Sequence, residues 1–460
     1  MRLKSNALLL VLILGLFTLV IGGRYLKAFP TIPRPTDSNT DTVSWDVKSS
    51  HPYVHRGSDG EVLVNLQVNG QEIKAPVRAP VNLVLVIDRS GSMSEAGKME
   101  YAKEAAKRII SGLGSSDRIG IVAYSTEVEL IYPIQFLKDK QTALSVVDSL
   151  YPTDSTNLSG GLTSGIDLLK SLVGEGFVNR VILLSDGLAN VGITDIGELG
   201  LIASRAAERG VHITTMGLGL NYDENLMMNI AEHGAGNYYF IESPTELTRI
   251  FEKEFGQILA TVAKDSVIYL SLAPGVQIKN IYGYTHTMKD GKVQIRLGEI
   301  FSGQERDILV KMNAPTNNLG LRPLLTASLE FTDITGDGKS VSLQKELTYE
   351  VTEDMNKVAS NENKEVTARG VSVDAAYQMY QATTYYERGD YDSAVENIKK
   401  ALGRISVLNS SAQRTEATVK QEEELRKAME DMSVAAPAPA SDPGKKLIKD
   451  YKAKAREQQK

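Results

Sequence analysis

The pattern of apolar and polar residues changes twice along the chain and divides it into regions. Between residues 81 and 263, short apolar runs alternate with longer amphipathic segments. Buried parallel strands are continuously apolar, whereas surface helices bury only one stripe, so the runs predict strands and the amphipathic segments predict helices. The expected strands are 82–88, 118–125, 180–185, 211–217 and 237–240, and the expected helices are 97–113, 159–173, 196–209, 223–233 and 244–262. Strands that alternate with helices predict an α/β fold with a doubly wound parallel sheet.

On both sides of this α/β region, apolar residues alternate with polar ones, as in half-buried β-strands. Residues 45–80 contain one such stretch, around Val62, Val64 and Leu66, and residues 264–352 contain several more. The first stretch would have unpaired edges if it stood alone. We therefore expect 45–80 and 264–352 to be the two parts of one β-sandwich, with the α/β domain of residues 81–263 inserted between them.

The C-terminal part of the chain has a helical pattern. Residues 366–432 predict a helical region in which Gly389 and Asp390 form the turn between two helices. The apolar spacing in this region resembles one tetratricopeptide (TPR) hairpin, and an ordinary helical hairpin fits it equally well. Neither could bury its apolar face alone, so we expect it to pack on a neighbour or a partner. Residues 433–460 begin with an Ala-Pro linker and end in a lysine-rich stretch, which predicts a disordered basic tail.

The N-terminus carries a targeting segment. Residues 1–27 contain an apolar stretch from about 7 to 22 with basic residues on both sides, which predicts a signal peptide or an N-terminal membrane anchor. No small-residue cleavage site follows the stretch, which favours an anchor that is not cleaved. The two basic flanks leave the membrane orientation open. Residues 28–44 are rich in Pro, Thr, Ser and Asp and predict a flexible stalk, so we expect the folded part to lie outside the cytoplasm, at the cell surface or in the periplasm.

Composition narrows the class of function. Of the 460 residues, 42% are hydrophobic and 23% are charged, which is typical of a globular protein. The net charge of −6 gives no indication of nucleic-acid binding. The chain has no cysteine, which excludes disulfide bonds, thiolate metal sites and cysteine nucleophiles.

Five side chains in three loops carry oxygen atoms that can converge on one cation. Asp88, Ser90 and Ser92 directly follow an apolar strand, Thr156 stands just before a helix, and Asp186 directly follows another apolar strand. We expect all three loops to lie at strand ends, because open α/β sheets bind ligands at the carboxyl ends of their strands. Carboxylate and hydroxyl oxygens are hard ligands, so the sequence predicts a divalent cation, Mg²⁺ first and Mn²⁺ or Ca²⁺ as alternatives, and not zinc or copper.

These five residues, in this order, resemble the metal-ion-dependent adhesion site of von Willebrand factor type A (VWA) domains, whose fold is Rossmann-like. The resemblance covers about residues 81–262. It implies that Ser90 and Ser92 bind the metal directly and that Thr156 binds it directly or through a water. It also implies that Asp88 and Asp186 mainly hold the coordinated waters and hydroxyls in place.

One local difference from the family stands in the second loop. Asp154 and Ser155 precede Thr156, where many VWA domains have glycines. An additional carboxylate at this place would change the metal preference or reduce the positive charge of the site.

The resemblance implies a binding protein and not an enzyme. A metal held mainly by neutral hydroxyls keeps much of its charge and an open position, which an aspartate or glutamate of a protein partner can complete. We therefore predict a bacterial, extracytoplasmic protein, anchored in the membrane through its N-terminal segment, that binds a protein partner in adhesion or complex assembly. The alternative is a structural scaffold that acts through its C-terminal helices, with the metal only stabilising the VWA domain. A metal-assisted hydrolase would need a general base, and no histidine lies in the three loops.

Overall fold

The structure is a computed structural model that describes residues 40, 42–72, 79–174, 176–186, 189–241, 250, 254, 256–335, 338–433 and 436–459. The predicted anchor, residues 1–27, lies outside the described residues, as does most of the predicted stalk. The last two residues of that stalk, Val43 and Ser44, belong to the first strand. Among the described helices, none is long and apolar enough to cross a membrane.

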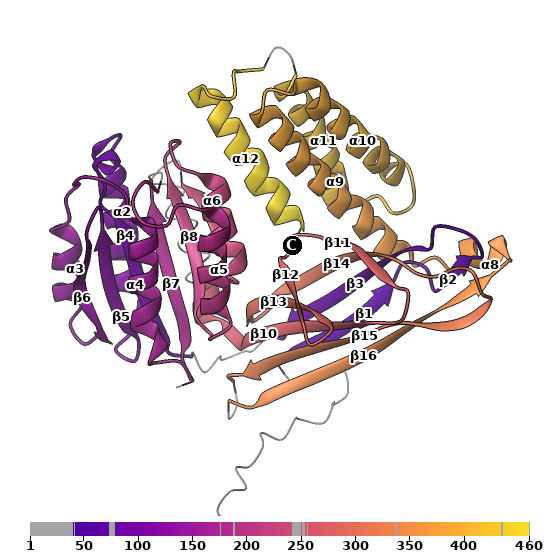
Figure 1. Ribbon diagram of the computed structural model, residues 1–460, viewed down its shortest axis with the longest axis horizontal. Coiled ribbons are helices and arrows are strands. Elements are labelled where there is room, and N and C mark those ends of the chain that lie inside the picture. Colours follow the sequence, from indigo (N-terminus) through magenta and orange to yellow (C-terminus); the bar gives the residue numbers. More distant parts are fainter. Residues whose placement is uncertain are drawn as a thin grey trace, which may run out of the picture. The chain divides into compact units, whose positions relative to one another are not determined.

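The two flanking β regions form a β-sandwich of a four-stranded and a six-stranded sheet (Figure 1). The strand order is β1-β3-β14-β11 in the first sheet and β12-β13-β10-β15-β16-β2 in the second. The strands are β1 (Val43–Ser49), β2 (Tyr53–His55), β3 (Glu61–Gly70), β10 (Thr261–Leu272), β11 (Gln277–Ile281), β12 (His286–Lys289), β13 (Lys292–Phe301), β14 (Glu305–Asn313), β15 (Gly320–Asp333) and β16 (Ser340–Thr352). The apolar faces of both sheets contribute to one core.

Strand pairing shows that the sandwich is interrupted by the α/β domain. In β3, Val62, Val64 and Leu66 are fully buried and alternate with partly exposed residues. This strand pairs antiparallel with β14, where Leu66 lies opposite Ile308. Because β3 precedes the α/β domain in the chain and β14 follows it, the prediction that the domain is inserted into a sandwich is confirmed.

The inserted domain is built on a six-stranded sheet with the order β6-β5-β4-β7-β8-β9. Its strands are β4 (Val81–Asp88), β5 (Arg118–Tyr124), β6 (Val128–Phe136), β7 (Val178–Ser185), β8 (His212–Leu218) and β9 (Tyr238–Ile241). Its described helices are η1 (Gly91–Ser94), α2 (Lys98–Gly112), α3 (Lys140–Asp148), α4 (Leu158–Lys170), α5 (Ile196–Ala207) and α6 (Glu224–His233). All neighbouring strands are parallel except β5 and β6.

Helices cover both faces of this sheet (Figure 1). On the central strand β4, Leu83 and Leu85 point to one face and pack in a core with α2 and α3. Val84 and Val86 point to the other face and pack with α4, α5 and α6. A strand buried on both sides must be apolar throughout, which explains the unbroken apolar run that predicted it. The predicted doubly wound sheet is confirmed.

The sequence did not indicate two elements of this domain, strand β6 and helix α3. Strand β6 lies at the edge of the sheet, and only Tyr132 is buried along it. It also contains Pro133, which an edge strand tolerates and a central strand does not. An edge strand with one buried residue has no period-2 pattern, which is the physical reason why the sequence did not indicate it. The predicted last helix, 244–262, lies mostly outside the described residues, and its end is shorter than predicted because β10 begins at Thr261.

The C-terminal region contains the helices α8 (Met355–Ser360), α9 (Lys364–Glu387), α10 (Tyr391–Asn409), α11 (Glu416–Asp431) and α12 (Asp442–Gln459). Gly389, with a left-handed φ of +79°, forms the turn between α9 and α10, and Asp390 caps α10 by accepting from the Ser393 amide. The predicted helical hairpin is thus present, and its likeness to a TPR remains a prediction. The hairpin also packs on the sandwich, because Val366 and Val373 of α9 share a small core with Leu309 of β14.

The prediction of a disordered basic tail over 433–460 is wrong. Helix α12 packs its apolar residues, among them Ile448 and Tyr451, into the same core as α9, α10 and α11. Its basic residues are not all solvated. Lys449 and Lys452 are almost fully buried and lie 2.7 and 3.1 Å from the carboxylate oxygens of Glu224 at the start of α6. The amino-acid composition gives the number of charged residues but not their ion-pair partners in the fold. For this reason the lysine-rich sequence suggested disorder.

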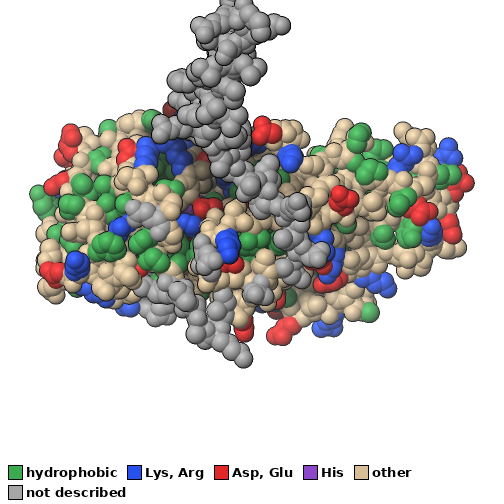
Figure 2. All heavy atoms as spheres, turned by 90° about the horizontal axis from the view of Figure 1, so that it is seen from below, with side chains coloured by type: hydrophobic (Ala, Val, Ile, Leu, Met, Phe, Trp, Pro, Cys, Tyr) green, Lys and Arg blue, Asp and Glu red, His purple; other side chains and the backbone are tan. Residues whose placement is uncertain are grey.

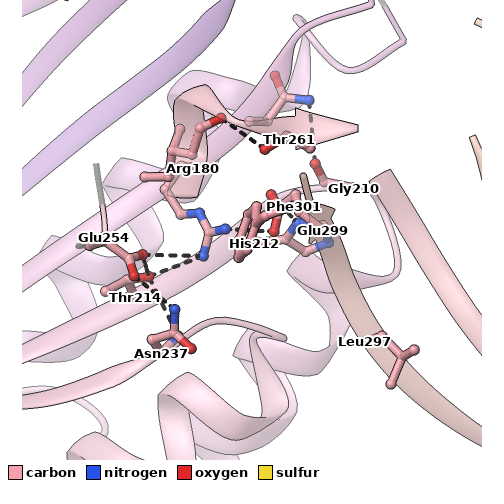
Figure 3. Close-up of polar contacts among 12 residues, drawn as sticks. Arg180, Gly210, His212, Thr214, Asn237, Glu254, Thr261, Leu297, Glu299 and Phe301 are labelled. Carbon is pink, nitrogen blue, oxygen red and sulfur yellow. Dashed lines mark hydrogen bonds and ion pairs between the residues drawn. The ribbon is translucent and has the colours of Figure 1, made fainter. Parts of the chain in front are cut away.

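A buried polar cluster joins the inserted domain to the sandwich (Figure 3). Glu299 of the sandwich strand β13 lies 2.5 Å from Arg180 of β7 and 2.7 Å from His212 of β8. A second carboxylate, Glu254, accepts from Thr214 and Asn237 and lies 3.8 Å from Arg180. Burial alone would raise the pKa of Glu299, but the charges of Arg180 and His212 outweigh it and lower that pKa to about 2.

The surface is of mixed character on the face that Figure 2 shows. Acidic and basic side chains are interspersed there with apolar and uncharged ones, and no sign of charge forms a broad field on that face. Such mixing is typical of the surface of a globular protein.

Candidate metal centre

The first loop of the predicted site begins where the buried strand β4 ends. Asp88 is the last residue of β4 and is fully buried. Its Oδ1 accepts a hydrogen bond of 2.8 Å from the backbone amide of Ser90, which turns the chain into the short helix η1. Short acidic side chains stabilise such turns by binding amides two residues further on. The turn places the hydroxyls of Ser90 and Ser92 on the same side of the loop.

Three oxygen atoms from two loops form the centre of the site. The hydroxyl oxygens of Ser90 and Ser92 are 3.1 Å apart, and the Ser92 hydroxyl donates to Oδ1 of Asp186 over 3.0 Å. Spacings of 3.0 to 3.1 Å are those of hydrogen bonds between these groups. Hydroxyl and carboxylate oxygens are hard ligands, so the donor type fits Mg²⁺, Mn²⁺ or Ca²⁺.

The second loop is hydrogen-bonded to the other two. The Gly91 amide donates to the Asp154 carbonyl over 2.8 Å, and the amides of Asn190 and Val191 both donate to the carbonyl of Thr156. Thr156 is 3% exposed, and its amide donates to the side chain of Asn190. The structure thus brings the Thr156 loop against the other two loops. The expectation that it follows a strand is wrong, however, because helix α3 precedes it.

Asp154 has a backbone conformation that suits glycine. Its φ is +23°, and its side chain is exposed. Aspartate is among the few residues with a side chain that tolerate positive φ, which explains how it replaces a glycine there. Through its carbonyl Asp154 bonds to Gly91, so its backbone supports the site.

Two supporting residues were not found from the sequence. The hydroxyl of Ser185 donates to Oδ2 of Asp88 over 2.8 Å, and Asn190 holds the Thr156 amide. Burial raises the pKa of Asp88 to about 6, although hydrogen bonds from Ser90 and Ser185 lower it. Ser185 is the residue before Asp186 at the end of β7, and that position was the signal that could have indicated it.

Lys98 is the third residue that sequence reasoning missed. It is the first residue of α2, and its ammonium lies 2.6 Å from Oδ2 of Asp186 and 3.4 Å from the carbonyl of Ser92. The side chains of Lys98 and Asp186 are 6% and 0% exposed. A lysine that begins an amphipathic helix ordinarily points to solvent, so its position gave no indication of this contact.

The centre relies on hydroxyls more than on carboxylates. Within the described part of the chain, no three His, Cys, Asp or Glu side chains gather as a metal cluster. The five predicted residues contribute two carboxylates and three hydroxyls, and Asp88, Ser90, Ser92 and Asp186 are linked through direct hydrogen bonds or through shared partners. The three hydroxyls are neutral ligands, so a dication bound directly by them alone would keep most of its charge.

Comparison with known proteins identifies the inserted domain. Residues 82–253 match the family model of the von Willebrand factor type A domain. Together with the doubly wound sheet, this match shows that the chain contains a VWA domain. Proteins with this domain often mediate protein–protein interaction or adhesion, and they commonly bind a divalent metal.

Two similar proteins extend the likeness beyond that domain. The uncharacterized protein YfbK of Escherichia coli (strain K12) is 30% identical over 218 residues, which are 47% of this chain and 38% of YfbK. The E3 ubiquitin-protein ligase WAV3 of Arabidopsis thaliana is 29% identical over 287 residues, which are 60% of this chain and 35% of WAV3. This chain therefore matches less than two fifths of the length of either relative.

A solved structure shares nearly the whole fold. A von Willebrand factor type A protein from Catenulispora acidiphila superposes with a TM-score of 0.71 over 90% of this chain and 97% of that chain, at 18% identity. At this identity the likeness concerns the fold alone. It shows that a fold with the sandwich and the helices in addition to the VWA domain occurs in another protein.

Proposed function

We propose that this protein binds a protein partner through a divalent cation, Mg²⁺ in the first place, held by the VWA domain. Ser90, Ser92 and Thr156 would bind the cation through their hydroxyls, and Asp88 and Asp186 would hold those hydroxyls and the coordinated waters. The bound cation would supply an open position for a carboxylate of the partner. The observation that carries the proposal is the cluster of the Ser90, Ser92 and Asp186 oxygens at 3.0 to 3.1 Å.

Exposed apolar side chains in the chain segments next to Thr156 and Asp186 support a protein as the ligand. Tyr151 is 63% exposed in the segment that leads to Thr156, and Ile193 is 38% exposed in the segment that follows Asp186. An interface commonly combines a few such apolar anchors with one strong polar contact. A partner that offers one aspartate or glutamate among apolar residues would match this surface.

We further propose that the protein works outside the cytoplasm on an N-terminal membrane anchor. The support is the apolar stretch at residues 7–22 with its basic flanks, followed by the Pro- and Ser-containing segment before β1. Such an anchor would hold the binding domain at a membrane surface, which suits adhesion or the assembly of a membrane-bound complex.

A structural scaffold is the alternative to metal-bridged binding. The C-terminal helices pack on both the sandwich and the VWA domain, which favours a scaffold role as the second candidate. Ligase activity, which the name WAV3 states for that protein, has no counterpart in our proposal, because the match covers only 35% of WAV3. The three loops of the site also contain no histidine as a general base.

Partner capture with the full-length chain tests the proposal. The chain would be exposed to extract of its source cells in Mg²⁺, in EDTA, and as Asp186→Ala in Mg²⁺. Asp167→Ala on the exposed face of α4 serves as the matched control. We expect a partner that is captured by the wild type and by Asp167→Ala and is lost both in EDTA and with Asp186→Ala. A partner retained in all samples would contradict the metal-bridged mechanism and favour the helical scaffold.

A further inference from the structure

A lysine side chain is built into the candidate metal centre. The Lys98 ammonium lies 2.6 Å from Oδ2 of Asp186, while the other carboxylate oxygen of Asp186 accepts from Ser92. The same ammonium also lies 3.4 Å from the Ser92 carbonyl. Lys98 therefore contacts the two residues that bring the first and third loops together.

The surroundings hold this lysine inside the protein. A Cβ atom at Gly219, in the loop after β8, would lie 3.1 Å from Cε of Lys98, so the loop closes directly over the lysine stem. Gly219 has a φ of +76°, a conformation that favours glycine. Glu95, the other acidic group near the ammonium, is 3.8 Å away and 67% exposed. Asp186 is thus the main charge partner of Lys98.

The charges of the site indicate how Lys98 affects the site without metal and the binding of metal. A buried carboxylate without a cation is costly, and the Lys98 ammonium provides one to Asp186. A dication that binds at the Ser90 and Ser92 hydroxyls would share Asp186 with that ammonium, and like charges in a poorly solvated site repel strongly. Lys98 therefore stabilises the arrangement of the site without metal and opposes the binding of metal.

We propose that Lys98 is a resident counter-cation of the metal centre, which holds Asp186 and Ser92 in place before metal binds and weakens the affinity for the metal alone. This inference rests on the proposed metal-dependent function. It has a consequence for the partner. The uncompensated positive charge of the metal and Lys98 together favours a ligand with a carboxylate, so that metal and partner bind more tightly together than either does alone.

Titration of the full-length chain with Mg²⁺ and with Mn²⁺ in a calorimeter tests the inference. Lys98→Gln removes the charge and keeps a hydrogen-bond donor near Asp186, whereas Lys98→Arg keeps the charge. Lys103→Gln on the same helix, which loses only a pair with the exposed Glu100, is the control for position. The unfolding temperature of each variant in EDTA shows whether it folds and how stable the metal-free site is.

We expect Lys98→Gln to bind both metals ~10- to 100-fold more tightly than the wild type, because a repelling charge has been removed. We also expect it to unfold at a lower temperature in EDTA, while Lys98→Arg and Lys103→Gln bind metal as the wild type does. Equal or weaker binding by Lys98→Gln, with the wild type binding metal, would overturn the inference alone. Binding of metal by none of the proteins would overturn the proposed function and the inference with it.

Discussion

At the residue scale, hydrogen bonds between the three loops position the candidate metal centre. The five candidate residues were proposed from the sequence because their order along the chain is specific, and their binding of a metal stays a prediction. The residues that hold them could not be named in the same way. Ser185, Asn190 and Lys98 act across loops that are far apart in sequence. Only Ser185 had a signal in the sequence, its place beside Asp186 at the end of an apolar strand.

The contact of Ser185 with Asp88 leads to a prediction about metal affinity. Ser185→Ala removes the 2.8 Å hydrogen bond to Oδ2 of Asp88 and leaves that buried carboxylate less well oriented. We expect metal affinity to fall by ~10- to 100-fold, as for other residues that orient ligands. Metal titration measures the change, and Ser145→Ala on α3, whose hydroxyl bonds only to a backbone carbonyl of its own helix, is the control. An unchanged affinity in Ser185→Ala would show that Asp88 needs no such support.

Close packing behind the site leads to a second prediction. A Cβ atom at Gly161, in α4, would lie 2.5 Å from the ring of Tyr124 at the end of β5. Gly161→Ala therefore forces α4 away from the sheet, and we expect it to lower the free energy of unfolding by ~1–3 kcal/mol. Gly403→Ala, in the middle of α10 with nothing within 4 Å, should instead raise it by ~0.5–1 kcal/mol. Denaturant unfolding measures the change in the free energy of unfolding for each variant. Destabilisation of both variants to the same extent would refute the packing argument.

At the scale of elements, helices and strands could be predicted where burial imposes a regular pattern of apolar residues, and could not be predicted where it does not. The central strands β4 and β7 are buried on both faces and were predicted within two residues of their ends. The edge strand β6 and the helix α12 were missed or misinterpreted. Their residues depend on contacts with other parts of the chain, and a local pattern does not contain those contacts.

Helix α12 contacts the VWA domain through an ion cluster centred on Glu224, beside a separate ion pair between Arg456 and Glu232. Glu224 is the carboxylate that both Lys449 and Lys452 contact. Burial alone would raise its pKa, but the two lysines outweigh this and lower it to about 2. Glu224→Gln leaves buried ammonium groups with less compensation, and we expect it to destabilise the docking of α12 by ~3 kcal/mol or more.

Hydrogen exchange of the amides in α12 measures this docking. Faster exchange in α12 of Glu224→Gln, with the strands of the sandwich unchanged, is the expected result. Glu198→Gln, at the exposed N-terminal turn of α5, is the control and should exchange as the wild type does. Unchanged protection of α12 in Glu224→Gln would mean that its apolar contacts with α9 suffice.

At the scale of the whole molecule, the chain forms the first strands of the sandwich, then the VWA domain, and then the remaining strands of the sandwich. This arrangement could be predicted because a single strand-like stretch before the domain needed partners. The joint itself could not be predicted. Arg180 and His212 lie in the VWA domain and Glu299 lies in the sandwich. The patterns of their segments indicate only buried strands.

The charges of this joint predict how stability depends on pH. The pKa of Glu299 is lowered to about 2 in the folded protein, whereas an unfolded glutamate titrates near its ordinary value of 4.5. A group with a lowered folded pKa contributes stability above its unfolded pKa and loses it as pH falls. We therefore expect the contribution of Glu299 to be complete above pH ~5 and to disappear between about pH 4.5 and 2.

Unfolding temperatures of the full-length chain between pH 7 and pH 2 measure this dependence. Glu299→Gln should be less stable at pH 7 by several kcal/mol, on the order of 3, and should lose less stability in acid than the wild type. Glu353→Gln, which breaks an exposed pair with Arg56, should change stability by less than ~1 kcal/mol at any of these pH values. Parallel pH curves for wild type and Glu299→Gln would contradict the account of the joint.

The central claim is that one divalent cation binds among the hydroxyls of Ser90, Ser92 and Thr156. The most direct test is anomalous diffraction from crystals of the full-length chain grown with Mn²⁺. The account predicts one strong anomalous peak in direct bonding contact with the Ser90 and Ser92 hydroxyls, and no peak there in crystals of Asp186→Ala. A peak elsewhere in the molecule, or none in the wild type at saturating Mn²⁺, would contradict it.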